Sequence, residues 1–326
     1  MDDPSGWRTL KINMFINVAL GLLKGALAFS SGSAAMYASA LNSLSNSASN
    51  LFSYLGIKKA ARPADIDHPF GYGKEIYFWS FVASVFMLGF ASTGAISQGY
   101  SQLIEKKAIH ISSLMIIILV IALVHEIILL YGSLNIVGKF LCNCTLLDGI
   151  RQFKRYNNPV NKTIILQNAS TIIATAISLV ALIAADFTRT YIIDALASIA
   201  VGIIMGSMAL ALAFQLKDMI IGRSCNPATI QLIGDLAMKA PGVTDITDIK
   251  TMYMGSKCLL LNMEIQVKSG LKVDEVDDVV NEVEKIIEGN LCNVKHINIE
   301  AVADDKVQGW KKAISQNKTM ALTEFV

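Results

Sequence analysis

The stretch NSLSNSASN, at residues 42–50, places a run of polar residues inside a segment that is otherwise long and apolar. Its polar groups are amides and hydroxyls, none of which is charged at neutral pH. Crossing the hydrocarbon core of a bilayer takes about 20 mainly apolar residues in a helix. Six stretches of this kind are present, at residues 12–29, 34–57, 77–103, 112–134, 163–185 and 191–216. The sequence therefore predicts an α-helical polytopic membrane protein with six transmembrane helices, the second of which holds the polar stretch.

The composition agrees with a membrane protein. Of the 326 residues, 53% are hydrophobic and 17% are charged, whereas a soluble domain carries about 25% charged residues. The net charge of +2 is too small to indicate nucleic acid or acidic substrates as partners. The cysteines have no CxxC spacing, which favours free thiols over disulfides. An enzyme is not indicated, because the sequence has no phosphate loop, zinc-hydrolase motif or nucleophile–base pair.

The distribution of positive charge predicts the orientation. One set of loops and flanks holds Arg8, Lys11, Lys58, Lys59, Arg62, Lys74, Lys139, Arg151, Lys154, Arg155, Lys162, Lys217 and Arg223. The opposite loops hold only Lys106, Lys107 and Arg189. Because cytoplasmic loops carry the excess of lysine and arginine, we expect both termini in the cytoplasm. The first apolar stretch has no cleavage site, so we expect it to be retained as a span.

From about Asn226 the sequence has the pattern of a small α+β domain. Residues 227–240 have apolar residues at helical spacing, and Asn226 before Pro227 is a helix start signal. Two alternating runs around Gly255 and Ser256 predict a hairpin, and an acidic amphipathic helix that ends at Gly289 follows. Residues 294–302 predict a last strand. We therefore expect a transmembrane domain at 1–222, a cytoplasmic domain at 223–304 and a polar tail at 305–326.

Several motifs occur in an order that resembles the cation diffusion facilitator family. SGSAAMYASALNSLSNSASN is followed by GIKKAARPADIDHPFGYGKEIYFWS, and IIDALASIAVGIIMG opens the last span. PGVTDITDIKTMYMGS is similar to the ferredoxin-like cytoplasmic domain of that family. ILQNAS in the fifth span resembles the branch that contains the mitochondrial-type zinc transporter, which typically has Leu-Glu-Asp there. The resemblance covers about residues 8–303.

The resemblance implies a homodimer, held together by the cytoplasmic domain and the membrane spans, that exports a divalent metal from the cytoplasm in exchange for protons. Zinc or manganese would be the substrate, with no organic cofactor and no nucleic-acid partner. The lipid bilayer would be the plasma membrane of a prokaryotic cell. The metal site would lie between the second and fifth spans, and the family's His or Asp ligand positions are Asn42 and Asn46 in this chain.

Polar side chains form a stripe in each of these two spans. Ser39, Asn42 and Asn46 share one helical face in the second span, and the fifth span holds Gln167, Asn168, Thr171 and Thr175. One interpretation is a hydrated cation path in which Asn42, Asn46 and Asn168 are weakened metal ligands. The other is hydrogen bonding that holds the helices together. Zinc prefers thiolate, imidazole or carboxylate ligands, so the amides argue against tight zinc binding and against the family's usual proton exchange at these positions.

A few ionisable groups also fall inside the predicted spans. His125 and Glu126 in the fourth span are candidates for a proton- or charge-carrying element. The alternative is that they pair with Lys24 of the first span or with a backbone group. Asp194 opens the sixth span, where we expect it to cap its own helix.

The loop between the second and third spans contains DIDHPFGYG, residues 65–73. Members of the family often bind a second ion there through Asp, a His three residues later and another His four beyond. The corresponding residues are Asp65, His68 and Tyr72, so the third ligand is missing. Asp67 could replace it, which gives a candidate loop site of Asp65, Asp67 and His68. The alternative is a turn fixed by the proline and glycines of the motif.

In the cytoplasmic domain, Cys258, Cys292, His296 and Glu300 could each bind metal, but their spacing is not a recognisable zinc motif. Buried cysteines and a histidine at a strand end are the favoured interpretation. The pair of thiols in CNC, residues 142–144, is weak evidence for a soft-metal site.

The sequence leaves three explanations of the neutral ligand positions open. The chain could be a metal transporter with an altered choice of substrate. It could be a transport-deficient homologue that serves as a partner or sensor subunit. It could also be an acid-to-amide variant of a transporter, since Gln167 and Asn168 are the amides of the family's Glu-Asp pair.

Overall fold

The computed structural model describes residues 4–106, 109–140, 159–256, 258–291 and 293–303. It divides into two compact units. The first, called here the helical unit, comprises Met1–Lys59 and Glu75–Lys217. The second, called here the α+β unit, comprises Ala60–Lys74 and Asp218–Val326, so that the loop after the second helix groups with the C-terminal part of the chain.

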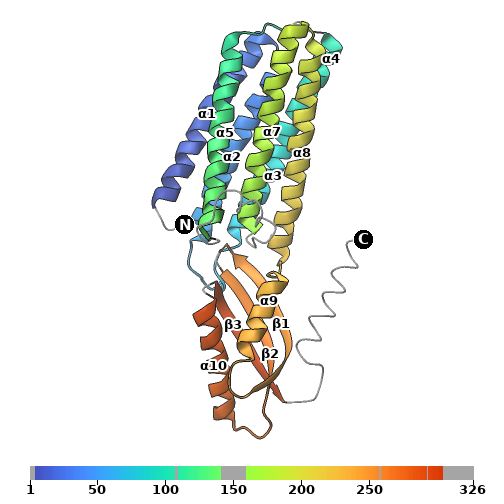
Figure 1. The fold of residues 1–326 in the computed structure, drawn as a ribbon. Coiled ribbons are helices and arrows are strands. Elements are labelled where there is room, and N and C mark those ends of the chain that lie inside the picture. The colour runs from blue at the N-terminus through green and yellow to red at the C-terminus, as the bar shows by residue number, and fades with distance from the viewer. Residues whose placement is uncertain (1–3, 107–108, 141–158, 257, 292, 304–326) are drawn as a thin grey trace, which may run out of the picture. The chain divides into compact units, whose positions relative to one another are not determined.

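The helical unit is built from long, roughly parallel or antiparallel helices (Figure 1). They are α1 (Pro4–Ser31), α2 (Ala34–Ala60), α3 (Glu75–Phe86), η1 (Met87–Ser92), α4 (Thr93–Glu105), α5 (Ser113–Phe140), α7 (Pro159–Thr188) and α8 (Tyr191–Ile221). α3, η1 and α4 follow one another without a break and together form the third predicted span. η1 is a π-helical turn, a feature that locally interrupts the regular helix hydrogen bonding.

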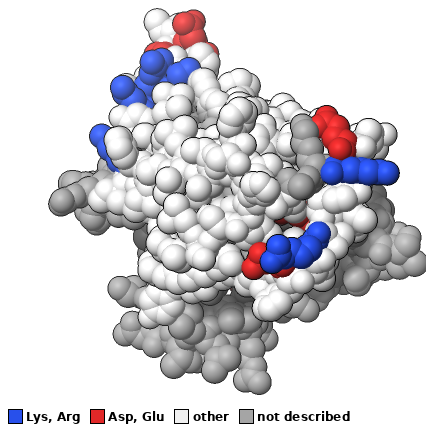
Figure 2. All heavy atoms as spheres, turned by 90° about the horizontal axis from the view of Figure 1, so that it is seen from above, with Lys and Arg blue, Asp and Glu red and all other residues white. Residues whose placement is uncertain are grey.

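Five segments of the described chain are long and apolar enough to cross a membrane: Lys11–Ser31, Glu75–Glu105, Ser113–Leu134, Gln167–Thr188 and Tyr191–Ile221. α2 has 27 residues, and its serines and asparagines keep its composition more polar than that of the others. It lies among them in the helical unit, and much of its first half is buried. The prediction of a polytopic helical membrane protein is confirmed. Viewed from above, the surface is formed mostly by uncharged side chains, with separate small groups of charged ones (Figure 2).

Small residues bring α4 and α8 into backbone contact. A Cβ atom on Gly99 would lie 2.6 Å from the carbonyl oxygen of Ala195, so only glycine fits at that position. The Ser198 hydroxyl donates to the Ala95 carbonyl at 2.8 Å, and the Ser92 hydroxyl donates to the Gly202 carbonyl at 2.8 Å. Such close approach with interhelical hydrogen bonds is how membrane helices associate when lipid removes most of the hydrophobic driving force.

The α+β unit has the predicted order of elements: α9 (Pro227–Ala237), β1 (Val243–Gly255), β2 (Cys258–Val267), α10 (Val273–Asn290) and β3 (Val294–Ala303). The sheet order is β1-β2-β3, with β1 and β2 antiparallel and β2 and β3 parallel. Apolar residues of α9, α10 and the sheet form one core. Asn226 caps α9 as expected, because its side chain accepts from Thr229 N at 2.7 Å. The predicted α+β fold of the C-terminal domain is confirmed.

Candidate cation path

One side of α2 is joined to α1 by hydrogen bonds. Lys24 Nζ donates to Ser43 Oγ at 3.0 Å, and Ser47 Oγ donates to the Met14 carbonyl at 3.1 Å. Ser43 and Ser47 are four residues apart and therefore lie on the same helical face. The polar groups on this side of α2 serve helix association.

A second side of α2 packs against α7 and α8. Ala35 shares an apolar cluster with Ala181 of α7 and Ala197 of α8. One turn further along, Ala38 shares a cluster with Ala174 of α7. α2 and α7 are therefore antiparallel, and the small alanine side chains allow the two helices to approach each other.

This alignment sets the level of the polar residues that follow. One turn after Ala38 comes Asn42, which lies near the level of Thr171, and Asn46 lies near the level of Gln167. Asn42 is 2% exposed, and Asn46 is half-buried. The positions that the resemblance assigns to metal ligands on α2 thus belong to the face directed at the fifth predicted span.

Three buried polar atoms on α2 have no hydrogen-bond partner within the described part of the chain. They are Ser39 Oγ, Asn42 Nδ2 and Ser45 Oγ. A buried donor or acceptor without a partner costs about 1–3 kcal/mol, so native proteins seldom keep several of them together without a reason. A chain of such groups at the centre of a helical membrane unit can solvate a polar or ionic ligand.

The predicted stripe on α7 is directed largely toward α5. Asn168 Nδ2 donates to Ser133 Oγ of α5 at 2.9 Å, and Thr175 Oγ1 donates to Glu126 Oε1 of α5 at 2.9 Å. Thr171 Oγ1 donates to the Gln167 carbonyl of its own helix at 3.0 Å. Among the described residues, no side-chain hydrogen bond joins this stripe to that of α2. Asn168, Thr171 and Thr175 share one face of α7, whereas Ala174 and Ala181 occupy the face next to α2.

Ionisable groups lie beside the α2 stripe. Lys24 is 0% exposed, and Glu126 is 6% exposed and interacts electrostatically with it. Within the described residues the two form no direct ion pair, and Glu126 Oε2 is buried without a hydrogen-bond partner. Both ring nitrogens of His125 are likewise buried and unpartnered there. Across the described residues no group of three or more His, Cys, Asp or Glu side chains could hold a metal ion.

Asp194 stabilises the start of α2. Its Oδ1 accepts from the Ser33 hydroxyl and its Oδ2 accepts from the Ala34 backbone N–H, each at 2.7 Å. Ser33 Oγ in turn accepts from the Met36 N–H at 3.1 Å, as a helix N-cap does. The prediction that Asp194 caps its own helix is wrong. α8 begins at Tyr191, three residues earlier, so the carboxylate is free to serve the neighbouring helix instead.

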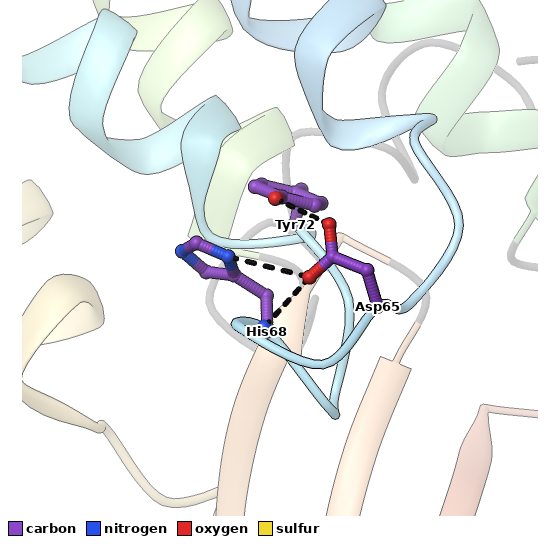
Figure 3. A network of polar contacts seen from close by, with 3 residues as sticks. All are labelled: Asp65, His68 and Tyr72. Atoms are coloured by element: carbon purple, nitrogen blue, oxygen red, sulfur yellow. Dashed lines mark hydrogen bonds and ion pairs between the residues drawn. The ribbon is translucent and has the colours of Figure 1, made fainter.

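In the loop at residues 60–74, the three residues of the second motif contact one another (Figure 3). Asp65 Oδ2 accepts from the Tyr72 hydroxyl at 2.7 Å, and Oδ1 accepts from His68 N at 2.8 Å, with His68 Nδ1 3.6 Å away. The Tyr72 hydrogen bond, followed by that of the His68 backbone, lowers the pKa of Asp65. The same bond to Asp65 raises the pKa of Tyr72. Tyr72 therefore donates a hydrogen bond to the carboxylate at the position where the resemblance implies a metal-binding imidazole. Asp67 is exposed nearby and accepts no side-chain hydrogen bond in this group.

Among the described residues of the α+β unit, the candidate ligands of the sheet do not form a metal-binding group. Cys258 opens β2, whereas His296 and Glu300 lie on β3. His296 packs edge-to-face on Phe70 of the loop at a centroid distance of 5.3 Å. The two line a surface depression of about 490 Å³ together with Glu284 and Lys295. Burial raises the pKa of the Cys258 thiol, as is typical of a structural cysteine. Cys292, Cys142 and Cys144 lie outside the described residues.

The contact between Lys24 and Ser43 was not foreseen from the sequence. The available signal was Lys24 itself, a charged residue in the middle of an apolar stretch. Its partner could not be identified from spacing, because Ser43 is one of several serines on α2 and the choice depends on how α1 packs.

Comparison with known protein families matches nearly the whole described chain. Residues 10–221 match the cation efflux transmembrane domain, and residues 225–301 match the cytoplasmic domain of cation efflux proteins. The chain belongs to the cation efflux family. The first match alone covers more than half of the 326 residues.

Several curated relatives are similar to most of this chain. The mitochondrial proton-coupled zinc antiporter SLC30A9 of Xenopus laevis is 25% identical over 263 residues, which are 78% of this chain and 46% of that protein. Magnetosome protein MamM of Paramagnetospirillum magneticum is 22% identical and covers 95% of this chain and 91% of its own. The cation-efflux pump FieF of Shewanella oneidensis is 23% identical, with 77% and 78% covered. The chain spans about half the length of the zinc antiporter that it matches.

Proposed function

We propose that this chain is a secondary transporter that moves a divalent metal cation, zinc or manganese, out of the cytoplasm along α2. Membership of the cation efflux family supports transport, and the names of the relatives include a zinc antiporter and a cation-efflux pump. The observation that carries the path is the run of unpartnered polar atoms at Ser39, Asn42 and Ser45 in the buried half of α2. The Ser39 and Ser45 hydroxyl oxygens can face a passing cation or its water shell, and Asn42 Nδ2 can donate to the oxygens of that water shell.

The donor set defines what kind of binding the path supports. Amide and hydroxyl oxygens are neutral, hard ligands that suit weakly held, partly hydrated ions better than tightly bound zinc. Asn42 and Asn46 supply two amides on one face of α2, and Asn168 is held by Ser133. Low affinity is compatible with transport, because a cation that is bound too tightly is not released.

The proposed topology, membrane and oligomeric state are those that the family resemblance implies. We place both termini in the cytoplasm and the chain in the plasma membrane, in agreement with the basic loops. We also propose a homodimer joined through the α+β unit and the spans, because residues 225–301 match the cytoplasmic domain of cation efflux proteins. Cross-linking of single cysteines introduced in α10 would test the dimer.

Metal flux into proteoliposomes tests the transport proposal. The purified chain should take up radioactive zinc or manganese saturably, and Asn42→Ala should lower the initial rate by about tenfold, since one solvating group is lost from the path. Asn17→Ala is the matched control, because that buried asparagine donates to the Asn13 carbonyl of its own helix at 2.9 Å. An equal loss in both variants would contradict a specific path at Asn42.

A second function is favoured by the neutral ligand positions themselves. A transport-deficient homologue that acts as a partner or sensor subunit would keep the fold while its membrane site lost its acids, as at Asn42 and Asn46. In that case no divalent cation is taken up at any pH gradient. The flux experiment therefore separates the two functions directly.

A further inference from the structure

Lys24 is an unusual residue for the interior of a membrane protein. Its side chain is 0% exposed, although lysine is almost never fully buried and is costly at the depth of a bilayer. Its Nζ donates to Ser43 Oγ at 3.0 Å, so the ammonium is held at a fixed position next to α2 instead of extending to the membrane surface.

Glu126 balances this charge from another helix. The carboxylate is 6% exposed, interacts electrostatically with Lys24, and accepts from Thr175 Oγ1 at 2.9 Å. Its second oxygen is buried and unpartnered within the described chain. His125 is the remaining ionisable group that interacts with Lys24 there. Lys24 thus links α1 to α2 through Ser43, and Glu126 links α5 to α7 through Thr175.

The Lys24 ammonium lies next to the amide positions. The alignment of α2 with α7 puts Asn42 near the level of Thr171, so Ser43, which binds Lys24, and Thr175, which binds Glu126, are about five residues apart along the helices. Ser43 adjoins Asn42 in the sequence and precedes Asn46 by three residues, one helical turn. A cation that reaches the amides consequently lies within about one helix diameter of a fixed positive charge.

We propose that Lys24 determines the cation affinity of the path by acting as a built-in competitor for the cargo, with Glu126 as its counter-charge. The ammonium repels a divalent ion at Asn42 and Asn46, and the carboxylate offsets part of that repulsion. The inference rests on the proposed transport function. The alternative role is purely structural, with Lys24 as a hydrogen-bonding link between α1 and α2.

Two substitutions of Lys24 distinguish these roles. Lys24→Gln removes the charge and keeps a donor, and Lys24→Arg keeps the charge. We expect Lys24→Gln to tighten zinc or manganese binding by about tenfold, and Lys24→Arg to stay within about threefold of the parent chain, because charge dominates at this distance. A purely structural link predicts the opposite change for Lys24→Gln, which would then bind metal no more tightly than the parent chain, while Lys24→Arg again stays close to it. Binding is measured by calorimetry on the full chain in nanodiscs.

Glu126 supplies the reciprocal test. Glu126→Gln leaves the ammonium unbalanced and should weaken binding by about tenfold, whereas the double variant Lys24→Gln with Glu126→Gln should return close to the parent affinity. The double variant also serves if a single variant fails to fold, since removing both members of a buried pair is better tolerated than removing one. Thermal unfolding of each variant is recorded in parallel.

The outcomes separate this inference from the proposed function. If the parent chain and all variants bind no divalent cation, the proposed function fails and the inference falls with it. If the parent chain binds or transports metal but Lys24→Gln binds no more tightly, Lys24 does not determine affinity and the transport function stands. Tighter binding in Lys24→Gln, reversed in the double variant, is the result expected.

Discussion

Two regions of the molecule occupy positions at which the family resemblance places metal ligands, and they satisfy their polar groups in opposite ways. The loop with Asp65 has charged, exposed groups, and Tyr72 and His68 already donate to its carboxylate. The middle of α2 has only neutral groups, is buried, and leaves Ser39 Oγ and Asn42 Nδ2 without a partner among the described residues. An exposed carboxylate that already accepts hydrogen bonds gains little from a ligand, whereas a buried amide N–H without an acceptor is stabilised by a ligand, such as a hydrated ion, that supplies one. The proposal of a cation path along α2 therefore rests on buried polar atoms that have no hydrogen-bond partner, and not on charged side chains.

The largest effect is expected when charge is added to the buried region. Asn42→Asp combined with Asn46→Asp should lower the dissociation constant for zinc by about 100- to 1,000-fold, because carboxylates are zinc ligands and amides are poor ones. Calorimetry on the purified chain measures it. Asn50→Asp, one turn further along α2, is the control and should change affinity little. Equal affinities of the parent and double variant would show that positions 42 and 46 are not ligands.

A stability measurement compares satisfied and unsatisfied groups on the same helix. Asp194→Ala should lower the free energy of unfolding by about 2–4 kcal/mol, since Ser33 Oγ and Ala34 N then lose their buried partner. Ser39→Ala should change it by less than about 0.5 kcal/mol or raise it, because the lost hydroxyl has no partner. Chemical unfolding in detergent micelles gives both values. A large loss in Ser39→Ala would mean that its hydroxyl is bonded in the membrane.

Much of the fold could be predicted from local patterns. The apolar runs located the helices of the membrane domain, and alternation and turn residues located the hairpin at Gly255. The start of α9 followed from Asn226 and Pro227, and its cap is present. The end of α10 at Asn290 is one residue beyond the predicted Gly289. These features depend on residues that are close in the sequence, so a single chain contains the necessary information.

The arrangement of the site could not be predicted in the same way. Asp194 caps α2 across 160 residues of sequence, and Asn168 bonds to Ser133 of α5. Helical spacing shows that Asn168, Thr171 and Thr175 share a face, but it does not show which neighbour that face meets. That choice depends on the rotation of α7, which the alanines at 174 and 181 determine by packing on α2 and α8. The sequence can therefore identify the polar residues of a membrane helix, but it cannot show which neighbouring helix they face.

The smallest effect is expected in the loop, where the carboxylate is exposed. Tyr72→Phe removes the hydrogen bond that contributes most to the low pKa of Asp65, so that pKa should rise toward its ordinary value of about 3.9. Because the folded pKa of Asp65 is lowered, its contribution to loop stability is present above the unfolded pKa and lost as pH falls through the folded one. Tyr72→Phe should shift this loss to a higher pH. Carboxyl NMR titration of labelled aspartate measures the shift, and Tyr100→Phe in α4 should leave Asp65 unchanged. An unaltered Asp65 titration in Tyr72→Phe would mean that the loop does not hold its carboxylate through Tyr72, and the contrast with α2 would then lose one of its two sides.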